Sequence, residues 1–150
     1  MRVGTGYDSH RFEAGRPLVL GGVEIEHELG LAGHSDADVL THAVIDALLG
    51  AAGLGDLGGH FPDDDERWRD ADSLDLLRAV LGMIPGHVVN VDASLVCEAP
   101  RLAGHRAEME RNLSTVLGAP VSVKATSNEG MGWIGRGEGI ACLAVALIET

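Results

Sequence analysis

The sequence contains few aromatic residues, few cysteines and a single lysine, Lys124. Aromatic residues make up 3% of the chain and hydrophobic residues 45%, so we expect a core built from alanine, valine, leucine and isoleucine. The two cysteines, Cys97 and Cys142, lie in apolar runs. So small a number excludes a disulfide framework and favours buried thiols that act as small hydrophobic side chains.

Basic charge is also scarce. The formal net charge is −12, and the absence of a basic patch argues against a nucleic-acid partner. No run of about 20 apolar residues is present, so we expect no membrane span. The chain begins directly with a strand pattern and shows no leader sequence. These features favour a cytoplasmic bacterial protein over a mature plastid form.

The length of 150 residues is typical of one domain, residues 1–150. The hydrophobic periodicity switches between strand and helix patterns along the chain. It predicts strands over residues 2–8, 18–25, 88–98, 121–126 and 140–148, and helices over 36–54, 73–84 and 101–117. Gly21-Gly22 supplies a tight turn within the segment 18–25, which we interpret as a hairpin. The order of elements indicates an α/β (α+β) fold with a mixed β-sheet covered by helices on one face.

Three features of the predicted elements indicate where a functional site or a subunit interface would lie. Ser35 or Asp36 is expected to cap the first helix. Residues 50–72 are rich in glycine and aspartate and read as a long loop, of a kind that is often functional. The last strand is apolar on both faces. One face should pack on helices, and the other requires a partner, which we expect to be another subunit.

Asp8 and His10 are the first candidates for chemistry. They lie two residues apart on a predicted strand and so point to the same face, while His42 lies on the first helix. One carboxylate and two imidazoles suit a catalytic Zn²⁺ with one open position, where a substrate oxygen can be polarised. The alternative is a surface strand followed by an unrelated helix histidine.

The first helix carries two acidic residues on the same face as His42. Asp38, His42 and Asp46 follow an i, i+4 spacing. A carboxylate on this face would be able to orient a metal-bound imidazole. For Asp46, simple solvation is an equal alternative.

Several short motifs occur in order from Met1 to about Glu149. They are Arg2 to Arg11, Gly33-His-Ser-Asp-Ala-Asp38, Gly55-Asp-Leu-Gly58, Phe61-Pro-Asp-Asp-Asp65, Lys124 to Glu129 and Gly135-Arg-Gly-Glu-Gly139. Together they resemble the 2-C-methyl-D-erythritol 2,4-cyclodiphosphate synthase family of the non-mevalonate isoprenoid pathway. The resemblance implies a homotrimer in which the sheets of three subunits pack around a central axis, with active sites between adjacent subunits.

The resemblance implies two metal sites. Asp8, His10 and His42 would bind Zn²⁺, and Glu129 would help to bind a second divalent cation, Mg²⁺ or Mn²⁺. A hard cation held by one carboxylate and phosphate oxygens is ordinary for Mg²⁺.

The resemblance also implies catalytic residues and a surface for a small, CDP-linked substrate. His34 and Ser127 would stabilise the transition state through hydrogen bonds, and Ser35 would lie at a helix N-terminus that suits an anion. The residues implied to contact substrate are Asp8, Ser9, His10, His34, Ser35, Asp56, Leu57, Gly58, Phe61, Pro62, Asp63, Asp64, Asp65, Ala99, Pro100, Arg101, Leu102, Thr126, Ser127, Asn128, Glu129, Trp133 and Arg136. In the family pattern, residues 56–58 hold the methylerythritol hydroxyls, 61–65 close over them, and 99–102 hold the cytosine.

A further segment would lie near the implied threefold axis. Arg136 matches an arginine that, in some relatives, meets the phosphates of an isoprenoid diphosphate in an axial cavity. Trp133 would stand where the family often has phenylalanine. The alternative is that Arg136 and Glu138 form ion pairs between subunits and that the cavity is empty.

Three hypotheses for function follow. In the family reaction, a phosphate attacks the β-phosphorus of the CDP group, so that CMP leaves and a cyclic diphosphate forms. Because the nucleophile is already an anion, alignment and charge neutralisation matter more than a strong base. A metal-dependent phosphohydrolase would use the same triad with water as the nucleophile. A non-catalytic isoprenoid-diphosphate-binding trimer would have no need of Asp56 or Glu129.

Overall fold

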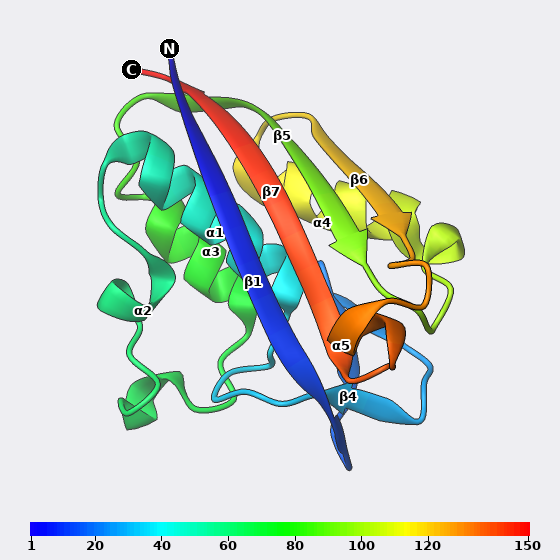
Figure 1. Ribbon diagram of the computed structural model, residues 1–150. Coiled ribbons are helices and arrows are strands. Elements are labelled where there is room, and N and C mark those ends of the chain that lie inside the picture. The colour runs from blue at the N-terminus through cyan, green and yellow to red at the C-terminus, as the bar shows by residue number, and fades with distance from the viewer.

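The two ends of the chain form the centre of the sheet. β1 (Arg2–Ala14) pairs antiparallel with β7 (Gly139–Glu149) along most of its length. β4 (Leu29–Leu31) extends the sheet beyond β1, and β5 (His87–Val96) and β6 (Val121–Thr126) extend it beyond β7. The strand order is therefore β4-β1-β7-β5-β6 (Figure 1).

Three long helices cover one face of this sheet in the computed structural model, which describes residues 1–150. They are α1 (Val39–Ala52), α3 (Ser73–Leu81) and α4 (Arg106–Leu117), all behind the strands in Figure 1. Only β5 and β6 pair in parallel, so the sheet is mixed. The predicted fold class, a mixed sheet with helices on one face, is confirmed.

Short elements connect these layers. They are the hairpin β2 (Leu18–Leu20) and β3 (Val23–Ile25), the helices α2 (Leu57–His60) and α5 (Gly132–Gly135), and two 3-10 turns at Glu66–Trp68 and Ala103–His105. Gly21 and Gly22 have φ angles of 59° and 72°, the left-handed backbone that the predicted hairpin turn requires. The segment 50–72 is less irregular than predicted, because α1 continues into it and two short helical turns follow.

Several element bounds differ from the prediction. β1 continues to Ala14, because β4 pairs with its last residues after β7 has ended. α4 begins at Arg106 rather than Arg101, since a 3-10 turn precedes it. A bulge in β5 between Val88 and Asn90 moves the alternation by one residue there, so Val88, and not Val89, is buried.

α1 lies directly on β1 because two glycines of the strand have no side chain. A Cβ atom on Gly4 would lie 2.0 Å from the Ala47 carbonyl oxygen, and one on Gly6 would lie 1.9 Å from that of Ala43. All but two of the residues of α1 are buried, and His42 is one of the buried residues. The helix and the strand that carry the predicted metal ligands are thereby held in contact.

Asp38 caps α1, which corrects the prediction that Ser35 or Asp36 does so. Its Oδ1 atom accepts hydrogen bonds from the backbone N–H groups of Thr41, at 3.0 Å, and Gly21, at 2.9 Å. Its Oδ2 atom accepts from the N–H of Gly22 at 2.9 Å and from the Thr41 hydroxyl at 2.8 Å. The fully buried carboxylate therefore joins the start of α1 to the β2–β3 hairpin, and the segment before it is free to form a loop.

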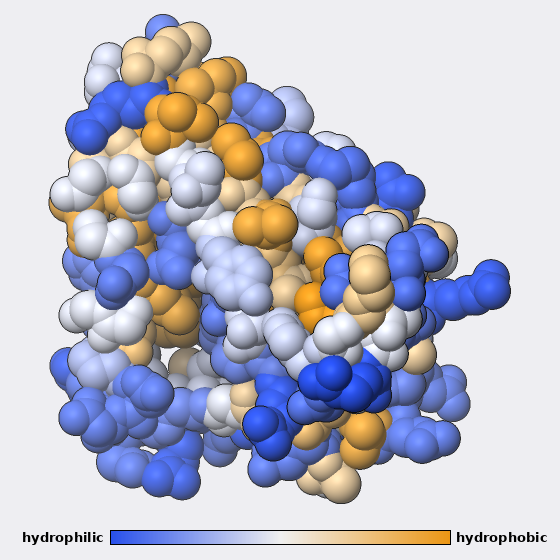
Figure 2. Space-filling view, viewed as in Figure 1, coloured by the Kyte–Doolittle hydropathy of each residue, from blue (hydrophilic) through white to orange (hydrophobic).

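The face of the sheet opposite the helices is apolar and exposed. Val3 and Tyr7 on β1 and Leu143 and Val145 on β7 are all more than two-fifths exposed. Figure 2 shows apolar residues from the top of this face to its middle, interspersed with polar ones. The last strand is thus apolar on both faces, as predicted, with only one of them covered within the chain. No helix in the structure has both the length and the apolar character needed to cross a membrane.

Candidate active site

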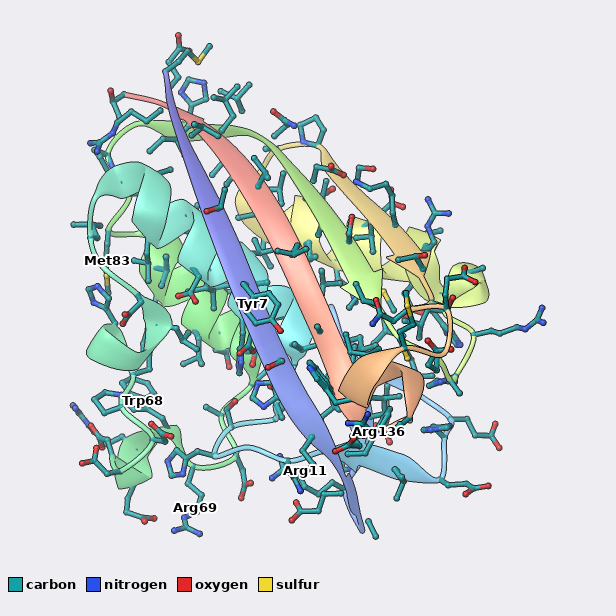
Figure 3. The ribbon with its side chains drawn as sticks, viewed as in Figure 1. Tyr7, Arg11, Trp68, Arg69, Met83 and Arg136 are labelled. Atoms are coloured by element: carbon teal, nitrogen blue, oxygen red, sulfur yellow. The ribbon has the colours of Figure 1, made fainter.

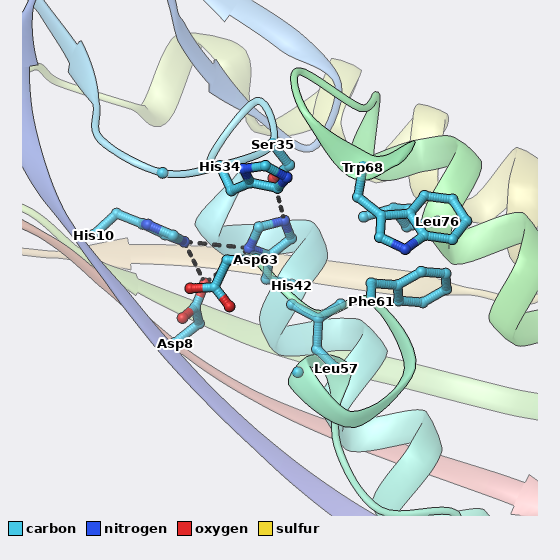
Figure 4. A pocket seen from close by; sticks show the side chains of 12 residues that line it. Asp8, His10, His34, Ser35, His42, Leu57, Phe61, Asp63, Trp68 and Leu76 are labelled. Atoms are coloured by element: carbon cyan, nitrogen blue, oxygen red, sulfur yellow. Dashed lines mark hydrogen bonds and ion pairs between the residues drawn. The ribbon is translucent and has the colours of Figure 1, made fainter. Parts of the chain in front are cut away.

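Asp8, His10 and His42 meet where α1 crosses β1 (Figure 4). The Oδ2 atom of Asp8 lies 2.8 Å from Nε2 of His10 and 3.1 Å from Nδ1 of His42, and the two imidazole nitrogens are 3.2 Å apart. Tetrahedral zinc, with bonds of about 2.0–2.2 Å, separates its ligand atoms by roughly 3.4 Å. Because the ligand atoms need only small outward shifts to reach that spacing, these residues fit a divalent metal ion.

The second nitrogen of His10 is held by the backbone. His10 Nδ1 lies 2.8 Å from the carbonyl oxygen of Ala32. A carbonyl oxygen can only accept, so Nδ1 donates the hydrogen bond. In the neutral ring, Nε2 therefore presents its lone pair to the centre of the triad, as a metal ligand must.

The pKa values of Asp8 and His10 are shifted in opposite directions. Burial by itself would raise the pKa of Asp8. The hydrogen bonds from His10 and His42, and the attraction to positive charge on these rings, are together larger and lower the pKa to about 2. Burial would lower the pKa of His10, but its hydrogen bond to Asp8 and the charge of that carboxylate raise the value. A metal ion bound by both groups would compete with the proton on His10.

Two buried serines hold the outer nitrogen of His42. His42 Nε2 lies 2.8 Å from Oγ of Ser73 and 3.2 Å from Oγ of Ser35. The Ser73 hydroxyl in turn donates to the carboxylate of Asp36. Asp46 neither orients the imidazole nor is simply solvated, the two alternatives that its spacing left open. Its Oδ1 atom accepts a hydrogen bond from the backbone N–H of Leu57 at 2.7 Å. The serines, rather than Asp46, contact the imidazole.

A cavity of about 290 Å³ opens beside the triad (Figure 4). Most of the residues that line it were implied by the family pattern. Those residues are Asp8, His10, His34, Ser35, His42, Leu57, Gly58, Phe61 and Asp63. The metal-ligand atoms thus face a space bounded by the segments proposed to hold the sugar alcohol.

Three lining residues, Gly33, Trp68 and Leu76, were missed by the sequence prediction. Trp68 packs edge-to-face on Phe61 with ring centroids 4.9 Å apart, at an interplanar angle of 89°. With Leu76, these rings form an apolar end to the cavity. A tryptophan in a loop rich in aspartate, within a chain of 3% aromatic residues, was a signal that should have suggested this role.

The predicted closing loop is already joined to His34. His34 Nε2 donates to the carbonyl oxygen of Asp65 at 2.9 Å, and the carboxylate of Asp65 pairs with Arg67 at 2.6 Å. Pro62 and Asp64 lie at the rim and line no cavity. Asp56 caps α2, accepting from Gly59 N–H at 2.9 Å, and does not line the cavity.

A second hollow lies where β5 and β6 end, at the other edge of the sheet. It has a volume of about 390 Å³ and shares no lining residue with the first. Its lining residues are Cys97, Glu98, Pro100, Arg101, Leu102, Ala103, Ala125, Thr126 and Ser127. The segment implied to hold cytosine and the hydroxyl residues implied to hold phosphate therefore lie together, with Ala99 beside them on the same loop. Within one chain they lie apart from the triad.

Glu129 lies in a turn that Glu98 holds in place. The Glu98 Oε1 atom accepts from the backbone N–H groups of Asn128 at 2.7 Å and Gly130 at 3.3 Å. Glu129 itself has a φ of 54°, in the left-handed region that residues other than glycine rarely adopt. The Oγ of Ser127 accepts from the Glu129 N–H at 3.2 Å. Glu129 lines neither cavity and is exposed to solvent.

The last predicted contacts lie near the lower end of β1. Ser9 and Trp133 line a third hollow, which also includes Glu138. Arg136 donates from Nε to Oε2 of Glu138 at 2.8 Å, an ion pair within one chain. Figure 3 shows Arg136 by α5, near the part of β1 that carries Arg11. The pairing of Arg136 with Glu138 thus occurs without a second subunit.

Comparison with known proteins places this chain among relatives of one kind. The model of the YgbB family matches residues 1–149. The chain belongs to the YgbB family. A curated relative from Salinibacter ruber, named 2-C-methyl-D-erythritol 2,4-cyclodiphosphate synthase, is 56% identical and aligns with 100% of this chain and 99% of its own length. A relative of the same name from Rubrobacter xylanophilus is 58% identical, over 99% of this chain and 94% of its own.

Several solved structures have the same fold as this chain. A structure titled as the synthase in a CDP-bound form has a TM-score of 0.90 at 36% identity, covering 99% of this chain and 100% of its own. A CDP complex from Plasmodium falciparum has a TM-score of 0.84 at 31% identity, covering 99% and 97%. The bifunctional IspDF protein from Campylobacter jejuni has a TM-score of 0.92 at 40% identity; this chain matches 41% of that longer chain.

Proposed function

We propose that this chain converts 4-diphosphocytidyl-2-C-methyl-D-erythritol 2-phosphate to 2-C-methyl-D-erythritol 2,4-cyclodiphosphate and CMP. An oxygen of the 2-phosphate attacks the β-phosphorus, the bond from that phosphorus to the bridging oxygen breaks, and CMP leaves. The reaction makes the chain a phosphorus–oxygen lyase of isoprenoid precursor synthesis. The observation that carries the proposal is the meeting of Asp8, His10 and His42 at the wall of a cavity in a chain whose relatives bear the synthase name.

The protein's task in this reaction is to align two phosphates and neutralise their charge. The attacking oxygen is already anionic, so no group has to remove a proton from it. We assign His34, on the cavity wall, and Ser127, in the second hollow, to hydrogen bonds that strengthen in the transition state. Ser35 and the apolar end formed by Phe61 and Trp68 would position the methylerythritol part.

Zn²⁺ is the ion that we propose for the triad, because it accepts mixed nitrogen and oxygen ligands in four-coordinate sites with one open position. When bound, the ion supplies positive charge to a phosphate oxygen. A second cation, Mg²⁺ or Mn²⁺, would be held by Glu129 together with phosphate oxygens. The exposed carboxylate of Glu129, next to the hydroxyl of Ser127, supports that assignment.

We further propose that the active protein is a homotrimer, with each site formed between neighbouring subunits. Within one chain, the triad cavity and the hollow beside Ser127 are separate, whereas one CDP-linked substrate has to reach both. The exposed apolar face of β1 and β7 gives the subunits a surface to bury. In this arrangement residues 1–150 act as one synthase domain, and we place it in the bacterial cytoplasm.

In some relatives an isoprenoid diphosphate occupies the axial cavity, and Arg136 is the residue that would bind it here. Arg136 would meet the diphosphate of an isoprenoid only if it exchanged its partner Glu138 for phosphate oxygens. The ion pair within the chain favours an axis without such a ligand. Titration of the trimer with an isoprenoid diphosphate, for wild type and for Arg136→Ala, measures this directly.

The first test is product analysis. Purified protein is incubated with the CDP-linked substrate, Zn²⁺ and Mg²⁺, and the products are identified by mass spectrometry. We expect equal amounts of CMP and cyclic diphosphate. His42→Ala should lower turnover about 10²–10³-fold, as for the loss of one charge-stabilising group, while His87→Ala, at an exposed histidine on β5, should not.

Other products would overturn the proposal in distinct ways. CMP together with a linear phosphate would indicate the phosphohydrolase, with water as nucleophile. No turnover by protein that holds both metals and binds an isoprenoid diphosphate would indicate the non-catalytic trimer. Near-normal turnover by His42→Ala after metal depletion would show that the triad is not the catalytic centre.

A further inference from the structure

We propose that Ser73 and Asp36 are positioning residues that fix the tautomer of His42, so that its Nδ1 lone pair faces the metal. The inference deepens the proposed function and rests on it for the presence of the ion. It concerns a hydrogen-bonded chain that runs from Asp36 through Ser73 to His42. The family resemblance implied no role for Ser73 or Asp36, although Asp36 lies within the motif at residues 33–38.

The direction of each hydrogen bond follows from what each atom can do. The carboxylate of Asp36 can only accept, so the single hydroxyl hydrogen of Ser73 is donated to it. The Ser73 oxygen can then act only as an acceptor toward His42 Nε2, which lies 2.8 Å away. Nε2 must therefore carry the ring hydrogen. In a neutral imidazole this leaves the lone pair on Nδ1, the atom that lies 3.1 Å from Asp8 Oδ2.

Burial favours this arrangement. Ser73 is fully buried and His42 is 5% exposed, so no bulk water replaces the serine as a partner for Nε2. The reversed tautomer would place two lone pairs, on Nε2 and on the serine oxygen, against each other. Two buried lone pairs that face each other leave both atoms without a hydrogen bond, which costs free energy, so the protein prefers the metal-binding tautomer.

The same carboxylate also fixes where Ser73 lies. Asp36 Oδ2 accepts a hydrogen bond from the backbone N–H of Ser73 at 3.0 Å. Asp36 thus accepts hydrogen bonds from both the main chain and the side chain of the first residue of α3. Asp36 comes from the loop that carries His34 and Ser35. One residue thus ties this loop, the start of α3 and the metal ligand on α1 together. Ser35 Oγ, 3.2 Å from Nε2, is a second and more distant hydroxyl oxygen beside the same nitrogen.

The test compares variants at the start of α3. Ser73→Ala removes the acceptor but keeps the backbone N–H that Asp36 binds. Ser73→Thr keeps the hydroxyl. Asp72→Ala is the matched control, because Asp72 caps the same helix end, accepting from Leu74 N–H at 2.9 Å, without touching His42. Asp36→Asn weakens the first link of the chain while keeping the shape of the side chain.

Two measurements are made on zinc-loaded protein. Competition with a chelator of known affinity gives the zinc dissociation constant, and long-range ¹H–¹⁵N spectra of ¹⁵N-histidine-labelled protein give the tautomer of His42. Ser73→Ala should weaken zinc binding about 10–100-fold, the range for losing a group that orients a ligand. Ser73→Thr should recover most of that loss, and Asp36→Asn should fall between. Asp72→Ala should melt at a lower temperature yet bind zinc as wild type does.

The inference fails if folded Ser73→Ala binds zinc as tightly as wild type, or if wild-type His42 carries its hydrogen on Nδ1. If Ser73→Ala does not fold, Asp36→Asn decides between the same outcomes. These results are independent of the products formed. Wild type that makes no cyclic diphosphate, while Ser73→Ala still loses zinc affinity, would overturn the synthase and leave the positioning role intact.

Discussion

At the scale of single residues, the site depends on which nitrogen of each histidine is free. His10 donates from Nδ1 to a backbone carbonyl, and His42 donates from Nε2 to a serine. The two rings would therefore offer different atoms to the proposed metal ion. The family resemblance placed both histidines in one site, but the atom that each presents is set by a neighbour distant in sequence: Ala32 for His10 and Ser73 for His42.

The stability of the metal-free protein should depend on the Asp8–His10 pair. The pKa of Asp8 falls from 3.8 to about 2 on folding, so its contribution is complete above pH 3.8 and is lost as the pH falls through about 2. The pKa of His10 is raised from 6.5, so its contribution is complete below pH 6.5 and is lost as the pH rises through the raised value. The pair should therefore stabilise most between these limits, with about 2 kcal/mol from the shift of Asp8.

Thermal melts of metal-free wild type and Asp8→Asn across pH 2–9 measure this contribution. We expect the difference in melting temperature to be largest at about pH 4–6 and to shrink on either side. A difference that does not change with pH would mean that Asp8 stabilises the fold by packing alone.

At the scale of elements, the contact of α1 with β1 positions the triad. Gly6→Ala would bring a Cβ atom to 1.9 Å from the Ala43 carbonyl oxygen, a backbone atom that cannot rotate away. We expect a loss of about 1–3 kcal/mol in the free energy of unfolding, measured with urea. Zinc affinity should fall as well, because the added Cβ atom would push α1, and His42 with it, away from β1.

Gly104→Ala is the control for this variant, since a Cβ atom there would meet nothing within 4 Å. Its free energy of unfolding and its zinc affinity should equal those of the wild type. If Gly6→Ala matched it in both measurements, the close approach of helix and strand would not be needed for the site.

The turn that carries Ser127 and Glu129 depends on one side chain from another loop. Glu98→Ala would leave the N–H groups of Asn128 and Gly130 without their shared acceptor, so the left-handed backbone at Glu129 would lose its support. We expect CDP in the presence of Mg²⁺ to bind about tenfold more weakly, as measured by calorimetry. Glu98→Gln, which keeps an oxygen at this position, should bind more like wild type, and equal loss in both variants would point to charge instead.

At the scale of the whole molecule, the exposed apolar face of the sheet should link subunit assembly to activity. Val145→Glu would place a charge in the middle of the apolar face of β1 and β7, where burial against another subunit would be costly. We expect sedimentation to show monomers in place of the proposed trimers. Turnover should disappear because the triad cavity of one subunit would no longer meet the hollow beside Ser127 of the next. Zinc should still bind, since the triad lies within one chain.

Ala79→Glu provides the comparison, because Ala79 is exposed on α3, in the helix layer on the other side of the sheet. It should remain trimeric and active. A Val145→Glu variant that stayed trimeric with full turnover would show that this face is not the subunit interface.

The sequence by itself determined the fold class, the hairpin, and the membership of Asp8, His10 and His42 in one cluster. Periodicity records which side chains are buried, and short motifs fix local spacing, so both can be recognised along the chain. The start of α1 was predicted wrongly because three of four neighbouring residues, Ser35, Asp36 and Asp38, are all good caps. Only the tertiary structure decided between them, by placing the backbone of Gly21 and Gly22 where Asp38 alone reaches it.

The orientation of His42 was likewise decided only by the tertiary structure. Asp46 has the right spacing on the helix, yet the loop at Leu57 occupies its carboxylate, and Ser73, 31 residues away in sequence, holds the imidazole instead. Such partners cannot be deduced from periodicity, because which buried donor meets which acceptor depends on how separate elements pack. The chain's own residues thus specify the ligands, and the packing of α1, α3 and β1 specifies how those ligands point.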